Sequence, residues 1–183
     1  MSTVSLTLDE IFDLAKKTLL ANGCDDETAS ILSDLIRNAE RDGSLSHGLF
    51  RLPAYVSGLK SGKINGKGKP EIKKISSSVI KVQGNNCLAP VVLNMGLPEL
   101  AKAAKENGVA VLAINNSHHM AAMWPETEKL AEEGLVAFAC TSYKPAVAPA
   151  GAIKPLFGTN PISFAWPRPG KTPVVYDMAT ASM

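Results

Sequence analysis

The feature that most constrains this fold is a helix that ends at a glycine and leads into an apolar strand, an order that occurs twice. A helix is expected over residues 90–107 with Gly108 as its stop, and residues 109–115 (VAVLAIN) then form a continuous apolar run. A second helix is expected over residues 124–133, and after another glycine it is followed by residues 135–142 (LVAFACTS). Uninterrupted apolar runs of this length are typical of strands buried inside α/β proteins. The order therefore predicts an α/β fold.

The N-terminal portion is expected to be helical. Thr7 starts a helix, Glu10 completes a capping box three residues later, and Gly23 ends it. Asp25 or Asp26 caps a second helix. The apolar stripe of this helix consists of Ile31, Leu32, Leu35, Ile36 and Ala39. The two helices form a hairpin that needs a further surface to pack against.

A third helix and several short strands complete the expected elements. The helix covers about residues 49–59, and the segments 72–75 and 79–82 alternate as in a β-hairpin. A GTNP turn leads into a strand at 162–166, and the last strand begins just after Pro173. The chain ends shortly after that strand, so we expect an incomplete α/β module.

Composition and charge exclude several classes of protein. No segment reaches the about 18 apolar residues of a membrane span, and charged residues interrupt the first 20 positions, so we expect a cytoplasmic protein without a signal peptide. The net charge is +2, but residues 60–74 hold six lysines and one glutamate, a local charge of +5. This stretch has no aromatic residue, which favours a solvated loop over a nucleic-acid surface.

Recognised metal and phosphate motifs are absent from the sequence. Cys24, Cys87 and Cys140 are too far apart for a CxxC site and are expected to be reduced thiols. The segment Gly66-Lys67-Gly68 lacks the later glycine of a Rossmann fingerprint. We therefore expect no bound metal and no Rossmann fold.

His47 and Arg51 form the first candidate site. If the chain is helical from His47 onward, Arg51 lies four residues later on the same face. This would pair a proton donor with a guanidinium that can hold a carboxylate through two hydrogen bonds. The alternative is that both side chains merely line a helix start. Ser46 is adjacent to His47, but neighbouring side chains point about 100° apart on a helix, so no serine-hydrolase triad follows.

His118 and His119 form the second candidate. They follow the apolar run 109–115, where α/β proteins place ligand-binding loops. No carboxylate stands at a metal-ligand spacing, which favours a cofactor or substrate loop over a zinc site. A polar turn with two ordinary histidines is the alternative.

Five segments together resemble one known family. They read SHGLFRLPAYVSGLKSG, INNSHHMAAMWPE, AEEGLVAF, KPLFGTNPISFA and YDMAT. In this order they are similar to the type-2 malate/L-lactate dehydrogenase family, whose NAD(P)-dependent oxidoreductases do not have a Rossmann fold. The second and fourth segments are most similar to its Δ1-piperideine-2-carboxylate/Δ1-pyrroline-2-carboxylate reductases.

The resemblance implies a role for individual residues. His47 would be the proton donor, Ser46 its charge-relay partner and Arg51 the group that binds the substrate carboxylate. Thr159 would contact the substrate. The implied cofactor contacts are His119, Met120, Ala121, Ala122, Met123, Asp177, Met178 and Ala179.

The resemblance also implies an architecture. Residues 1–118 would form a helical, substrate-binding portion, and residues 119–183 an incomplete NAD(P)-binding portion. The fold class is then α/β, with a helical N-terminal portion and the start of a non-Rossmann NAD(P)-binding mixed sheet, apparently truncated. Family members are roughly twice as long and continue to a catalytic aspartate, so the chain is expected to be an N-terminal half.

The implied activity is NAD(P)H-dependent reduction of cyclic imino acids to L-pipecolate and L-proline. NADPH is the expected cofactor, with NADH as the alternative, and a homodimer is expected. The alternative functions are a malate, lactate or ureidoglycolate dehydrogenase, or a truncated remnant without activity.

Overall fold

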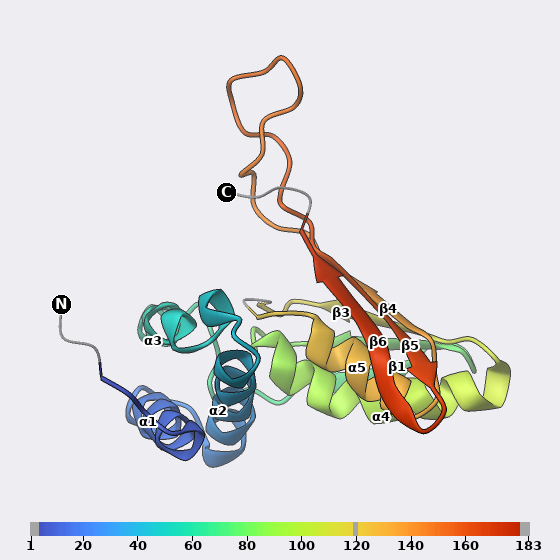
Figure 1. Ribbon diagram of the computed structural model, residues 1–183, viewed down its shortest axis with the longest axis horizontal. Helices are drawn as coiled ribbons and strands as arrows, with labels where there is room; N and C mark the ends of the chain where they lie inside the picture. Colours follow the sequence, from blue (N-terminus) through green and yellow to red (C-terminus); the bar gives the residue numbers. More distant parts are fainter. Residues whose placement is uncertain (1–3, 119–120, 180–183) are drawn as a thin grey trace. The chain divides into compact units, whose positions relative to one another are not determined.

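A computed structural model describes residues 4–118 and 121–179 of the chain (Figure 1). The chain divides into two compact units, Met1–Ala121 and Ala122–Met183, here called the first and the second unit. The helical N-terminal part and the small sheets confirm the expected mixed α/β class. No described helix is long and apolar enough to cross a membrane.

The first unit begins with the expected helical hairpin, α1 (Leu8–Ala21) and α2 (Asp26–Arg41). Thr7 and Glu10 form the predicted capping box, and the Asp25 side chain caps α2 by accepting from the Thr28 N–H. Both helix starts were therefore predicted correctly from local spacing. The hairpin buries Ile11, Ala15, Leu19, Leu32 and Ile36 in one core that also includes Leu52, Tyr55 and Leu88.

A pair of 3-10 turns connects α2 to the third helix. They are η1 (Leu45–His47) and η2 (Leu49–Arg51), and α3 (Leu52–Lys60) follows directly. The sequence predicted one helix over 49–59, but its first turn is a 3-10 turn. Pro53 lies in the first turn of α3, where its missing N–H costs no helical hydrogen bond.

The first unit continues with a mixed sheet of order β1-β2-β3. Strands β1 (Glu71–Lys74) and β2 (Val79–Gln83) form the predicted antiparallel hairpin. Helix α4 (Ala89–Asn107) ends at Gly108 as expected, and β3 (Val111–Asn115) then pairs in parallel with β2. The second core forms where α4 packs on this sheet and contains Ile80, Val82, Cys87, Val91, Val92 and Ala103.

The prediction that β3 is buried was wrong. Val111 is 54% exposed, whereas Leu112 and Ile114 are half-buried against the second core. The reason is that β3 is the last strand in the order β1-β2-β3 of the described residues, and that α4 packs on one face of this sheet. An apolar run indicates which side chains could be buried. Whether they are buried depends on the helices and strands that pack beside the strand.

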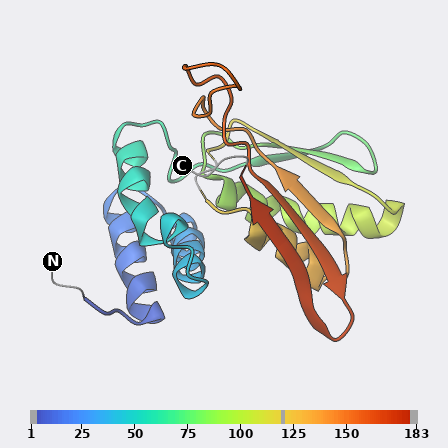
Figure 2. The same cartoon turned by 45° about the horizontal axis from the view of Figure 1, so that its top comes forward.

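The second unit contains α5 (Trp124–Glu132), β4 (Ala137–Cys140), β5 (Ile162–Arg168) and β6 (Lys171–Met178). The strands form an antiparallel sheet of order β4-β5-β6, and α5 packs against all three strands. The Thr127 and Ser163 hydroxyls form a buried hydrogen bond of 2.7 Å between α5 and β5. Residues 141–161 run as a long loop beyond the end of the strands (Figures 1 and 2).

Two predictions for this unit were wrong. The run 135–142 was expected to be a buried strand, but Phe138 on β4 is 64% exposed. The last strand was expected to begin after Pro173, but β6 begins at Lys171 and includes this proline. Among the described strands β6 pairs only with β5, so an edge position explains how the strand tolerates a residue without an N–H.

Candidate active site

His47 lies at the end of the η1 turn and contacts the preceding serine. The Ser46 Oγ lies 2.9 Å from the His47 Nδ1, and the Ser44 Oγ lies 3.5 Å from the same nitrogen. The sequence argument placed neighbouring side chains about 100° apart and did not anticipate this hydrogen bond. The structure thus brings Ser46 and His47 into contact, and the charge-relay role of Ser46 stays a prediction.

The turn that carries His47 is held by a residue that the sequence did not indicate. Glu40, on α2, accepts a hydrogen bond of 2.7 Å from the Leu49 N–H through its Oε1. Its carboxylate lies so close to Gly48 that a Cβ there would overlap it. Glu40 therefore anchors the turn, and no local sequence pattern reveals this contact because nine positions separate the two residues.

Arg51 is half-buried and its guanidinium is poorly satisfied. The Nε is buried and has no hydrogen-bond partner among the described residues, and no described carboxylate forms an ion pair with it. Burial raises the pKa of the neighbouring Tyr55 to about 12, although the Arg51 charge lowers it. A buried cationic donor without an anion is costly. This arrangement suits a carboxylate ligand.

The structure corrects the predicted geometry between His47 and Arg51. Gly48 has φ −87° and ψ −135°, which interrupts helical backbone between them. The two residues therefore belong to separate 3-10 turns rather than to one helical face. Their proximity in sequence remains, but the argument from helical spacing was wrong.

His118 follows β3 and is fixed by its backbone. Its N–H donates to the Cys87 carbonyl at 3.0 Å, and its carbonyl accepts from the Ala89 N–H at 2.9 Å. The side-chain Nε2 is buried without a hydrogen-bond partner among the described residues. His119 and Met120, two of the implied cofactor contacts, lie outside the described residues.

The implied cofactor segments of the second unit meet at the start of α5. Ala122 and Met123 are buried there, whereas Asp177, Met178 and Ala179 at the end of β6 are exposed. The Asp177 Oδ2 accepts hydrogen bonds from the Met123 N–H at 2.8 Å and the Trp124 N–H at 2.9 Å. Ala121 is half-buried and belongs to the first unit.

Asp177 therefore caps α5 from a distant strand. Met123, the residue at the N-cap position, makes no side-chain hydrogen bond to the helix. A helix that starts without a capping residue of its own was the sequence signal that could have indicated a cap from elsewhere in the chain. The Asp177 carboxylate occupies the position where a helix start would otherwise attract a phosphate. Its Oδ1 accepts no hydrogen bond from the described residues, so the site fits a hydroxyl or amide group of a cofactor better than a phosphate.

Thr159 lies in a tightly packed turn. A Cβ at Gly158 would overlap the Tyr143 carbonyl, and the Asn160 Oδ1 accepts from the Tyr143 N–H at 3.1 Å. Asn160 has φ +40°, a left-handed conformation that asparagine tolerates better than most residues. The turn therefore holds the half-buried Thr159 in a defined place within the second unit.

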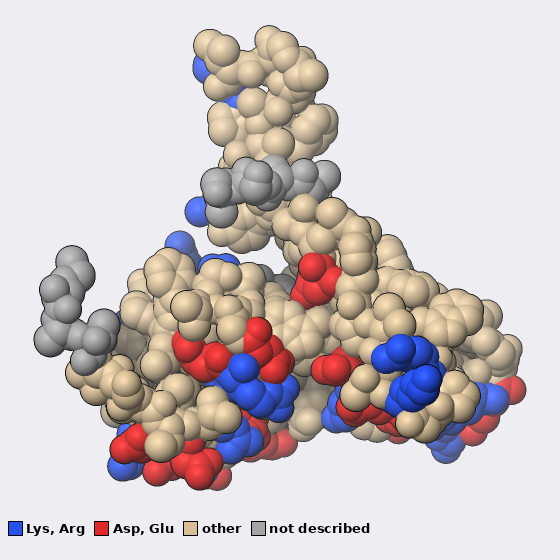
Figure 3. Space-filling view, in the orientation of Figure 1, with Lys and Arg blue, Asp and Glu red and all other residues tan. Residues whose placement is uncertain are grey.

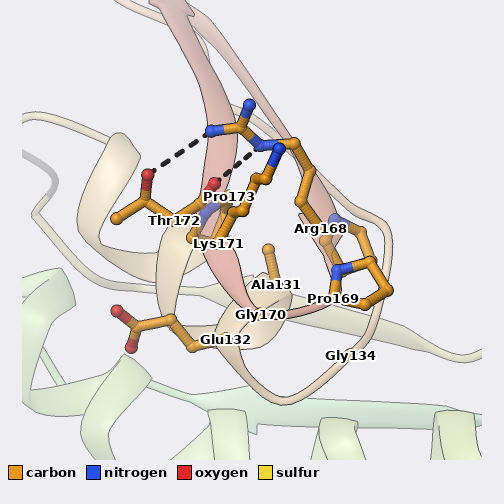
Figure 4. Close-up of a pocket in the computed structure, with 10 residues that line it drawn as sticks. Ala131, Glu132, Gly134, Arg168, Pro169, Gly170, Lys171, Thr172 and Pro173 are labelled. Carbon is orange, nitrogen blue, oxygen red and sulfur yellow. Dashed lines mark hydrogen bonds between the residues drawn. The ribbon is translucent and has the colours of Figure 1, made fainter.

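A hollow of about 720 Å³ lies elsewhere, between the end of α5 and the turn from β5 to β6 (Figure 4). Arg168 crosses this turn by donating from Nε to the Thr172 carbonyl at 2.8 Å. None of the sequence-predicted site residues lines the hollow, and its lining includes no histidine or cysteine. No group of metal-ligating side chains occurs among residues 4–118 and 121–179 either. The hollow is therefore separate from the residues that the sequence predicted as site residues.

Comparison with known proteins gives a consistent result. A family model described as malate/L-lactate dehydrogenase matches residues 6–183. The chain is 40% identical over its whole length to a Δ1-pyrroline-2-carboxylate reductase 1 of Burkholderia ambifaria, covering 54% of that protein. The chain thus spans about half the length of the curated relatives it matches.

Solved structures show the same likeness. The crystal structure of the Δ1-piperideine-2-carboxylate reductase of Pseudomonas syringae is 40% identical and matches with a TM-score of 0.93, over 99% of this chain and 55% of that one. A malate dehydrogenase from Pyrococcus horikoshii is 33% identical and matches with a TM-score of 0.89, over 97% of this chain and 51% of that one.

Proposed function

This chain belongs to the malate/L-lactate dehydrogenase family of oxidoreductases, and we propose that it contributes to NAD(P)H-dependent reduction of cyclic imino acids. The substrates are Δ1-piperideine-2-carboxylate and Δ1-pyrroline-2-carboxylate, and the products are L-pipecolate and L-proline. The 40% identical relatives bear these names, whereas the malate dehydrogenase is 33% identical. This difference favours the imino acid over a 2-hydroxy acid.

The observation that carries the proposal concerns the guanidinium of Arg51. Its buried Nε has no partner among the described residues, and a substrate carboxylate would supply one. A guanidinium holds a carboxylate through two parallel hydrogen bonds, which fix the orientation of the substrate as well as its position. Arg51 thus orients the cyclic imine for reaction.

His47 supplies the proton. Reduction of a C=N bond adds a hydride to the carbon and a proton to the nitrogen, and the histidine becomes neutral as it donates. The Ser46 hydroxyl hydrogen-bonds to Nδ1 at 2.9 Å, so we assign the proton transfer to Nε2. Ser46 holds the ring in one orientation during this step, and Glu40 holds the turn that carries it.

A nicotinamide cofactor, when bound, supplies the hydride. By family resemblance, Ala122, Met123 and Asp177 would contact it. Two backbone N–H groups hold the Asp177 carboxylate through Oδ2, so that Oδ1 can accept from a polar group of the cofactor. We assign residues 1–118 to substrate binding and residues 119–183 to the cofactor. We also propose that NADPH is the preferred cofactor and that the protein is a cytoplasmic homodimer. Family resemblance supports all three points.

The test is oxidation of NADPH by the purified chain in the presence of Δ1-piperideine-2-carboxylate, with pyruvate as the control substrate. We expect imine-dependent oxidation that His47→Ala reduces by at least about a hundredfold, as general acid catalysis contributes roughly 10²–10⁴-fold. Oxidation with pyruvate but not with the imine would assign the chain to the hydroxy-acid dehydrogenases. Equal rates for the wild type and His47→Ala would remove His47 from the mechanism.

A further inference from the structure

His118 has no role in the proposed function, although the sequence singled it out together with His119. The family resemblance implies a cofactor contact for His119 and none for His118. The His118 side chain is half-buried, and its Nε2 is buried without a hydrogen-bond partner among the described residues. A buried polar nitrogen without a partner costs free energy, so its presence calls for a physical explanation. A bound ligand is one such explanation.

Strand pairing fixes the side to which His118 points. The His118 N–H donates to the Cys87 carbonyl at 3.0 Å, and the Ala89 N–H donates to the His118 carbonyl at 2.9 Å. These two hydrogen bonds form a parallel bridge between Leu88 and His118. Residues paired in such a bridge direct their side chains to the same side of the two strands. His118 therefore points to the side on which Leu88 is buried.

This side faces the hydrophobic core that borders Arg51. Leu88 belongs to the same core as Leu52 and Tyr55. Arg51 directly precedes Leu52 in the chain. Burial raises the pKa of Tyr55 and the Arg51 charge opposes this rise, so the Tyr55 and Arg51 side chains lie close together. His118 and Arg51 thus border one core of the first unit, from the segment after β3 and from the start of α3.

Two buried nitrogens beside this core lack partners among the described residues. They are the Arg51 Nε and the His118 Nε2, and none of the ion pairs among the described residues includes either residue. In Figure 3 acidic side chains over α1 and α2 lie beside basic ones at the surface, where Asp26 pairs with Lys16. A guanidinium can only donate, so the partner that Arg51 lacks is an acceptor. A ligand that brings acceptor atoms would satisfy both nitrogens.

We propose that His118 binds the substrate carboxylate together with Arg51. This inference rests on the proposed function, because the cyclic imino acid supplies the carboxylate. An ionised carboxylate has two oxygens that accept about four hydrogen bonds and has no donor, so it can accept from both residues. The imidazole then carries a proton on Nε2 and donates it to this hydrogen bond. Two converging donors hold the carboxylate in one orientation, which presents the C=N bond to His47 in one pose.

The test is binding of L-pipecolate, the proposed product, followed by nuclear magnetic resonance. The imidazole signals of His118 are assigned by their loss in the His118→Phe protein. L-Pipecolate should shift the Nε2 signal of His118 in a saturable way, and Arg51→Lys should weaken this binding. The titration needs no cofactor, because Arg51 and His118 both lie in the first unit.

Three variants of His118 separate hydrogen bonding from packing. His118→Phe keeps an aromatic ring but has no donor, so the Kd for L-pipecolate should rise at least about tenfold, as expected for a lost hydrogen bond to a charged group. Glutamine and asparagine carry the same amide, but only glutamine reaches about as far as Nε2. His118→Gln should therefore bind within about threefold of the wild type, and His118→Asn should bind as weakly as His118→Phe. Equal losses in all three proteins would show that the ring only packs, and would overturn the proposal.

Acetate distinguishes the carboxylate from the rest of the ligand. It carries the carboxylate without the ring, so it should shift the same Nε2 signal at a higher concentration. A shift with L-pipecolate but none with acetate would place His118 at the ring and overturn the assignment to the carboxylate. Unchanged affinity of His118→Phe for L-pipecolate, or no shift of the Nε2 signal in the wild type, would overturn it as well.

The same measurements separate this inference from the proposed imine reduction. If Arg51→Lys weakens binding of L-pipecolate and His118→Phe does not, the inference about His118 fails and the role of Arg51 stands. If both substitutions weaken binding but the wild type does not oxidise NADPH with Δ1-piperideine-2-carboxylate, the carboxylate site stands and the proposed reduction fails.

Discussion

Asp177→Ala is the most direct test of the arrangement at the start of α5. In the wild type the Asp177 Oδ2 accepts hydrogen bonds from the Met123 and Trp124 N–H groups, at 2.8 and 2.9 Å. Met123 itself provides no cap. Alanine removes both hydrogen bonds and the negative charge that faces the positive end of the helix.

The expected cost follows from the loss of a helix cap. Replacing a capping side chain by alanine costs about 0.5–2 kcal/mol, and the interaction of a carboxylate with a helix start contributes roughly 0.3–1 kcal/mol. Because Asp177 is exposed, we expect a total of about 1–2 kcal/mol. For a chain of this size the melting temperature should fall by about 3–6 °C. Asp177→Asn keeps an acceptor but loses the charge, so its effect should be about half as large.

The assay is thermal melting followed by far-ultraviolet circular dichroism. Asp13→Ala is the matched control, because Asp13 is exposed on α1 and makes no hydrogen bond or ion pair among the described residues. It should melt within about 1 °C of the wild type, since surface substitutions away from specific contacts have small effects. An Asp177→Ala protein that also melts within this margin would refute the capping argument. It would also reopen the start of α5 as a phosphate site.

Three further predictions concern the first unit. Arg51→Lys keeps the charge but loses the planar fork, so the KM for the imine should rise at least about tenfold in steady-state kinetics while kcat changes less; an unchanged KM would place the carboxylate elsewhere. Gly48→Ala should displace the Glu40 carboxylate and lower the free energy of unfolding in urea by about 1 kcal/mol, whereas an unaltered denaturation midpoint would contradict the close approach. Burial, with a smaller contribution from a neighbouring aspartate, raises the pKa of Cys24 to about 11, and burial raises the pKa of Tyr55 to about 12. Both pKa values thus exceed those of the unfolded chain, which are about 8.5 for cysteine and about 10 for tyrosine. The free energy of unfolding should therefore be highest below about pH 8.5 and fall as the pH rises through 11. A urea midpoint that stays constant from pH 8 to about 10.5 would count against this.

Much of the candidate site was identified from motifs rather than from geometry. Ser46, His47 and Arg51 are neighbours in the sequence, so a short segment contains all three. Their roles came from family resemblance, and the helical spacing offered as a physical reason was wrong because Gly48 interrupts the helix. Glu40 escaped notice because its contact with Leu49 depends on how α2 packs beside the turn.

The sequence by itself determined the features that depend on hydrogen bonds between near neighbours. The Thr7–Glu10 capping box, the Asp25 cap and the glycines after α4 and α5 act within a few residues, so their spacing was sufficient. The tertiary structure alone decided which apolar strands are covered and which side chain caps α5. Exposure of Val111 and Phe138 depends on the layers beside each strand, and Asp177 reaches Met123 across 54 positions. Such contacts form only when distant segments pack or pair with one another. The spacing of residues within one segment does not indicate which distant segment will lie beside it.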